Sequence, residues 1–156
     1  MSGLTADEHR HLGRLTRMVD CARVRVHRAR GAGAHDRLRD LVLWASRGRA
    51  VTLGNHVFLP DRCAADLPTL AHELTHCGQY QAWGAWRYFM RGTSAQLRDL
   101  LHRTLGIGSS PYAYGLETGK PFEAYGMEQQ AQIVEDGFRG DAAALAVSPY
   151  HPDDLA

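Results

Sequence analysis

The sequence is short of cysteine, of long apolar runs and of any excess of one charge. Its 156 residues include only three cysteines, Cys21, Cys63 and Cys77, and no two of them form a C-x-x-C pair. An odd and scattered set argues against a disulfide framework and predicts free thiols in a reducing compartment. No apolar run approaches the roughly 18 residues of a membrane span, so we expect no membrane partner.

The N-terminus also lacks the apolar core that a secretory signal peptide requires. It reads MSGLTADEHRHLGRL, in which charged and polar residues interrupt every apolar stretch. We therefore expect a cytoplasmic protein, or one exported by a specialised secretion or injection route. Hydrophobic residues make up 44% of the chain and charged residues 22%, which is typical of one soluble globular domain over residues 1–156.

The net charge is only +1, but arginine is concentrated in the first third of the chain. A basic segment of this kind can bind nucleic acid or an acidic partner, and such a binder is one alternative function. No base-stacking or groove-reading motif accompanies the charge. A solvated surface is therefore the favoured interpretation, and nucleic acid is not the partner we expect.

The most informative element is an H-E-x-x-H motif at residues 72–76, with the sequence HELTH. On a helix, residues four apart lie one turn apart on one face, so His72 and His76 could bind the same Zn²⁺. Glu73 lies about 100° round the helix from His72. It could take a proton from a water molecule at the metal without being a ligand. The motif thus predicts a zinc-dependent peptidase that acts on a peptide or protein substrate, with Glu73 as the general base.

A second hypothesis is a non-catalytic zinc module, in which the metal only stabilises the fold. A structural zinc site usually has four protein ligands, so Cys77 or another histidine would complete it. Glu73 favours catalysis, because a structural site has no use for a base beside the ligands. The stripe formed by Leu70, Leu74 and Cys77 is expected to anchor the motif helix in the core.

A third protein ligand is expected downstream, where four glutamates compete: Glu117, Glu123, Glu128 and Glu135. Glu117 falls in a Gly-rich loop, where its position would be poorly fixed. Pro121 suits the first turn of a helix that we expect to run to Phe138. Glu123 would then lie in that first turn, where acidic residues are favoured by the helix dipole alone.

Glu128 and Glu135 would share one face of that helix with two alanines, Ala124 and Ala131. Small side chains would let the helix come close to the one that carries the motif. We therefore predict Glu128, in mid-helix, as the third zinc ligand. Glu135, or alternatively Gln132, could orient a ligand histidine from outside the coordination sphere.

Periodicity predicts an α+β domain that is mostly helical, with a short sheet packed on the motif helix. A capping box at Thr5 and Glu8 would begin a first helix running to about Asp20. The remaining expected elements follow in chain order: a strand at 23–27, a helix at 36–48, strands at 50–53 and 56–59, the motif helix ending near Trp83, and a further helix capped by Thr93 or Ser94.

The strands at 50–53 and 56–59 flank Gly54-Asn55, which suits a tight hairpin. We expect the strand from His56 to Leu59 to lie along the cleft, where an extended peptide could pair with it. A dense aromatic cluster follows the motif helix and is expected to pack beneath it: Trp83, Trp86, Tyr88 and Phe89.

Taken together, the sequence resembles the small bacterial zincin metallopeptidase domains of the gluzincin type. These occur in toxin-like and injection-system-associated proteins, including the eCIS core domain. HELTH is the specific part of the resemblance, which spans roughly residues 23–138 through four stretches: Val24–His27, Ala50–Pro60, Ala71–His76 and Glu128–Ala131.

The resemblance implies a small mixed sheet packed on the active-site helix, and Zn²⁺ held by two histidines and a downstream glutamate. It points to Glu128 for that glutamate, in agreement with the choice made from helix spacing. Peptide hydrolysis also needs a donor for the developing oxyanion. Four residues in the right part of the chain are candidates: His102, Tyr112, Tyr114 and His151.

Overall fold

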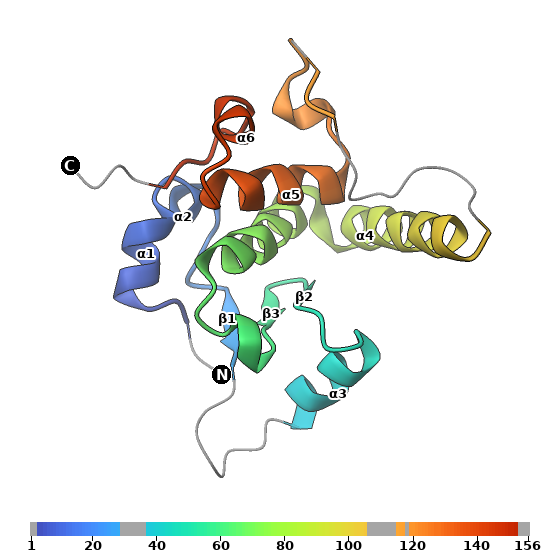
Figure 1. Ribbon diagram of the computed structural model, residues 1–156. Helices are drawn as coiled ribbons and strands as arrows, with labels where there is room; N and C mark the ends of the chain where they lie inside the picture. Colours follow the sequence, from blue (N-terminus) through green and yellow to red (C-terminus); the bar gives the residue numbers. More distant parts are fainter. Residues whose placement is uncertain (1–2, 29–36, 106–114, 118, 153–156) are drawn as a thin grey trace.

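A small sheet lies on one side of a long helix, and a second helix crosses the other side (Figure 1). The computed structural model describes residues 3–28, 37–105, 115–117 and 119–152. The long helix is α4 (Leu67–Leu105) and the crossing helix is α5 (Met127–Phe138). The mostly helical α+β fold expected from the sequence is confirmed.

The chain begins with two short helices, α1 (Ala6–Leu12) and α2 (Leu15–Met18). The expected capping box is present: Glu8 N donates to Thr5 Oγ1 at 3.2 Å, and Thr5 N donates to Glu8 Oε2 at 2.9 Å. The prediction of a single helix running to about Asp20 was wrong. Gly13 adopts a positive φ of 51°, which ends α1 because a left-handed residue cannot continue a right-handed helix.

The sheet has the order β1 (Arg25–His27), β3 (His56–Phe58), β2 (Val51–Leu53). β2 and β3 form the antiparallel hairpin expected around Gly54, which has a φ of +65°. β1 pairs with β3 in parallel. The strand expected to line the cleft is therefore the central one, with both edges occupied, and it cannot accept a peptide. β2 is an edge strand of this sheet and contacts α4.

Helix α4 begins after Asp66, whose Oδ2 accepts a hydrogen bond from Thr69 N at 3.1 Å. Gly84 interrupts it with φ 76° and ψ 164°, so the motif helix ends at Trp83, as the sequence indicated. The next helical stretch follows Gly84 directly. The prediction that a new helix begins at Thr93 or Ser94 was therefore wrong, because both residues lie inside continuous helix.

The helix expected from Pro121 begins later than the sequence indicated. A 3₁₀ turn, η2 (Phe122–Ala124), comes first, and Tyr125 and Gly126 are extended before α5 starts at Met127. Glu128 therefore lies in the first turn of α5 and not in mid-helix. Ala124 is outside the helix and does not contribute to its face. Three shorter elements complete the described chain: α3 (Arg37–Ala45), η1 (Asp61–Cys63) and α6 (Ala142–Val147).

The core lies where α4 packs on the sheet, on α1 and α2, and on α5. The predicted stripe of Leu70, Leu74 and Cys77 is buried there, each residue at most 2% exposed. Burying a leucine of this kind stabilises the fold by about 1.5–3 kcal/mol. Of the aromatic cluster expected to pack beneath the motif helix, Tyr88 is buried, but Trp86 is 78% exposed and Phe89 is 49% exposed, so the expectation was wrong for those two residues. None of the described helices is long and apolar enough to cross a membrane.

Candidate metal centre

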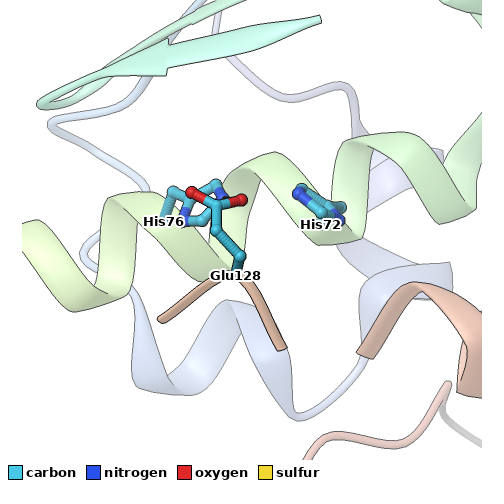
Figure 2. A group of neighbouring side chains, drawn as sticks. All are labelled: His72, His76 and Glu128. Carbon is cyan, nitrogen blue, oxygen red and sulfur yellow. Dashed lines mark ion pairs between the residues drawn. The ribbon is translucent and has the colours of Figure 1, made fainter. Parts of the chain in front are cut away.

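Helices α4 and α5 bring two imidazoles and a carboxylate together. One ligand-capable atom each of His72, His76 and Glu128 lies within 4.8 Å of the others. Figure 2 shows the Glu128 carboxylate against the His76 ring, on the side that faces His72. The structure thus juxtaposes all three residues that we predicted as metal ligands.

The two helices run antiparallel, and polar contacts follow one another along their interface. In order along α4 these contacts are Asp66 Oδ2 with Arg139 Nη2 at 3.1 Å, His72 Nδ1 with Glu135 Oε2 at 3.0 Å, and His76 Nε2 with Glu128 Oε2 at 3.4 Å. Each histidine of the motif therefore faces its own carboxylate on α5. The antiparallel direction explains why the earlier histidine, His72, meets the later glutamate, Glu135.

Glu135, which the sequence offered as a residue that could orient a ligand histidine, lies beside His72. Its carboxylate lies 3.0 Å from His72 Nδ1, although the approach is not aligned as a hydrogen bond. Its other oxygen accepts a hydrogen bond from Arg139 Nη2 at 2.8 Å. The His72 imidazole, opposed by burial and assisted by Arg139, lowers the pKa of Glu135 to about 2. Gln132, the alternative, instead donates to Asp136 at 2.9 Å and takes no part in the cluster.

His76 is buried and held from both of its ring nitrogens. Nδ1 bonds Gln79 Oε1 at 2.8 Å, and Nε2 faces Glu128. Burial alone would lower the pKa of His76, but the Glu128 carboxylate outweighs it and raises that pKa to about 9. Burial opposes ionisation of Glu128 as well, yet His76 brings the net pKa of Glu128 below its usual value. A metal ion bound at Nε2 would have to displace the His76 proton.

Glu73 points to the sheet side of α4, whereas both histidines face α5, and its charge contributes to the raised pKa of His76. Thr52 Oγ1 on β2 bonds Glu73 Oε2 at 2.7 Å, and Tyr88 Oη donates to the Thr52 carbonyl at 3.2 Å. Glu73 and Thr52 are both buried. The Glu73 carboxylate is thus fixed next to a proposed ligand in sequence but outside the cluster that the three ligands form.

The donor set fits a zinc ion. Imidazole nitrogen and carboxylate oxygen are both zinc ligands, and catalytic zinc sites commonly have three protein ligands and one open position. Among the described residues, the cluster has no fourth member that is a histidine, a cysteine or an acidic residue. Cys77, the fourth ligand of the structural-zinc alternative, is fully buried in the hydrophobic core instead.

One expectation about the site, a donor for the oxyanion, lies mostly beyond what the structure describes. The oxyanion candidates Tyr112 and Tyr114 are outside the described residues, and so is the side chain of His102. His151 is described, but it is not part of the cluster of His72, His76 and Glu128.

Sequence reasoning missed three residues that support the site: Thr52, Gln79 and Gln130. Gln79 could have been found, because a residue three positions after His76 on a helix lies on the same face. Thr52 and Gln130 come from other elements, and although both fall in stretches that carry the resemblance, nothing in those stretches indicates what their side chains contact. Their roles depend on tertiary contacts that local patterns do not encode.

We expect all three cysteines to be free thiols, with Cys77 protected in the native protein. The structure shows each of them unpaired. Burial raises the pKa of the Cys77 thiol far above its usual value, which suppresses the reactive thiolate. Titration without reductant should find three thiols after denaturation, and Cys77 unmodified before it. Prompt native modification of Cys77 would contradict this description. Loss of metal in Cys77→Ser would favour the structural-zinc alternative.

Comparison with known proteins gives one match. No curated protein and no solved structure matches the chain. A protein-family model described as the eCIS core domain matches residues 9–84, from α1 to the Gly84 break of α4. Residues 9–84 are therefore similar to the eCIS core domain, and this segment includes His72, Glu73 and His76, while Glu128 lies beyond it.

Proposed function

We propose that this protein is a zinc-dependent metallopeptidase. The observation that carries the proposal is that the motif's histidines and its glutamate lie on different sides of α4. His72 and His76 converge with Glu128 on the α5 side, while Glu73 is held next to them from the sheet side by Thr52. A purely structural metal site would need the first group of residues and would have no use for the second.

In this proposal His72, His76 and Glu128 would hold Zn²⁺. When bound, the ion would supply Lewis acidity and lower the pKa of a water ligand towards about 7. Glu73 accepts a proton from the attacking water as its oxygen adds to the peptide carbonyl. Glu73 then delivers that proton to the departing amine as the C–N bond breaks. The second proton of the water stays with the products, which leave as a carboxylate and an ammonium group, and Glu73 returns to its starting state.

The substrate class follows from this chemistry: a peptide or protein chain. The test is incubation of the zinc-loaded protein with a proteome-derived peptide library, with new termini identified by mass spectrometry. Cleavage should disappear when a chelator removes the metal and return when zinc is added back. A zinc-loaded protein that yields no new termini above the metal-free sample contradicts the proposal.

Thr52 should matter for turnover more than for metal binding. Thr52 is not one of the three proposed ligands, and its hydroxyl bonds the Glu73 carboxylate at 2.7 Å. A hydrogen bond to a charged group is worth about 1.5–3 kcal/mol, so Thr52→Val should lower kcat by about tenfold or more with zinc retained. Thr52→Ser keeps the hydroxyl and should recover most of the activity. Equal kcat values in Thr52→Val and Thr52→Ser would remove Thr52 from the mechanism.

A further inference from the structure

Buried hydrogen bonds connect His76 to the start of α5 through two glutamine side chains. His76 Nδ1 and Gln79 Oε1 are 2.8 Å apart, and Gln79 Nε2 donates to Gln130 Oε1 at 3.0 Å. Gln130 Nε2 then donates to the Tyr125 carbonyl at 2.9 Å. Gln79 and Gln130 are 6% and 7% exposed, so water competes little for their amides.

Two backbone carbonyls set the direction of this chain of bonds. Gln79 Nε2 also lies 3.1 Å from the Met127 carbonyl, and Gln130 Nε2 faces the carbonyl of Tyr125. A backbone carbonyl can only accept, so the amide nitrogen of each glutamine must face it. The amide oxygen of Gln79 is thereby turned towards His76. Since that oxygen can only accept, His76 Nδ1 must be the donor.

A neutral imidazole carries one N–H, so a proton fixed on Nδ1 leaves the lone pair on Nε2. Nε2 is the ring nitrogen that lies 3.4 Å from Glu128 Oε2, within the proposed ligand cluster. We propose that Gln79 and Gln130 are positioning residues: when a divalent metal ion displaces the Nε2 proton of His76, they keep the remaining proton on Nδ1 and the Nε2 lone pair directed at the metal. This inference rests on the metal site of the proposed function and is independent of peptidase activity.

We call the hydrogen bonds from His76 through Gln79 and Gln130 the glutamine relay. The protein offers a matched control for a test of this relay. Gln81 lies on the same helix, two residues from Gln79, and its amide also makes tertiary hydrogen bonds, to Asn55 Oδ1 at 2.8 Å and to the Asp20 carbonyl at 3.2 Å. Gln81→Leu therefore removes a comparable set of bonds without touching His76. A loss of affinity through general destabilisation should appear in Gln81→Leu as well as in Gln79→Leu.

The experiment titrates Zn²⁺ alone into the metal-free wild type and into three variants, Gln79→Leu, Gln130→Leu and Gln81→Leu, by competition with a chromophoric chelator. The temperature is one at which circular dichroism shows every variant folded. Losing a residue that orients a ligand typically costs about 10–100-fold in metal affinity. We expect a loss in that range for Gln79→Leu, a smaller loss for Gln130→Leu and wild-type affinity for Gln81→Leu.

A second readout follows the tautomer directly. Long-range ¹H–¹⁵N spectra of the zinc-bound wild type should show the His76 proton on Nδ1. Gln79→Glu keeps an oxygen acceptor for that proton and should bind zinc within a few-fold of the wild type, even if the loss of its donor bonds lowers stability.

Three results would overturn the relay: equal affinity in Gln79→Leu and the wild type, equal losses in Gln79→Leu and Gln81→Leu, or a His76 proton on Nε2. A wild type that binds no zinc would overturn the metal site as well. A wild type that binds zinc but cleaves no peptide would remove the proposed peptidase activity and leave the relay standing.

Discussion

Replacing Glu73 by glutamine should abolish peptide hydrolysis while zinc remains bound. Glutamine has nearly the same shape, and its amide oxygen can still accept the Thr52 hydroxyl bond, so the helix and the ligand cluster should keep their arrangement. An amide cannot take up the proton from the attacking water. Loss of the general base alone should lower kcat on the order of 10²-fold or more.

Bound zinc and turnover should be measured on the same preparation of Glu73→Gln, with zinc by elemental mass spectrometry and turnover on a peptide that the wild type cleaves. Glu123→Gln is a suitable control, because Glu123 is an exposed glutamate upstream of α5 and outside the cluster. It should match the wild type in both measurements. If Glu73→Gln instead loses zinc in proportion to activity, Glu73 is a ligand and the proposed mechanism is wrong.

Removing the Glu128 carboxylate should release zinc, whereas removing that of Glu135 should only weaken its binding. Glu128 shares the ligand cluster with His72 and His76, while Glu135 faces Nδ1 of His72 and is also bound by Arg139. Glu128→Ala should therefore reduce zinc affinity by far more than the roughly 10–100-fold expected for Glu135→Ala.

Zinc affinity measured by chelator competition decides between the two glutamates. Both lie on α5, seven residues apart, and both have mostly buried side chains, so Glu128→Ala and Glu135→Ala serve as controls for each other. The reverse order, with zinc lost from Glu135→Ala and kept by Glu128→Ala, would require a different rotation of α5 over α4. It would also remove the basis for assigning Glu128 to the metal.

The parts of this site that local chemistry determines could be predicted from the sequence. The spacing of His72 and His76 places them one turn apart on any helix, and a stripe of apolar residues shows which face of that helix is buried. The break after Trp83 follows from Gly84, and the hairpin follows from Gly54-Asn55. Each of these features depends on residues that are close together in the chain.

Glu128 was placed at the site for a reason that the structure corrects. We expected it in mid-helix, brought close by Ala124, but extended backbone at Tyr125 and Gly126 delays the start of α5. Glu128 reaches His76 from the first turn of α5 instead, because α5 crosses α4 in the antiparallel direction. The register between two helices is a tertiary property, and helical periodicity within one segment cannot supply it.

The pairing of strands in the sheet is likewise a tertiary property that local sequence patterns cannot predict. Alternation of residues identifies β3 as a strand but cannot reveal that β1, some thirty residues earlier, pairs with its other edge. β2 therefore lies against the motif helix, and Thr52 meets Glu73 there. The sequence reasoning that selected Glu73 as a base could not identify the residue that holds it.

The most direct test of the metal centre is anomalous X-ray scattering at the zinc absorption edge from crystals grown with zinc. We expect a single strong peak per chain within bonding distance of His72, His76 and Glu128, with Glu73 and Glu135 near it but not coordinated. A peak bonded to Cys77 or Glu135, or the absence of any peak among His72, His76 and Glu128, would contradict the account.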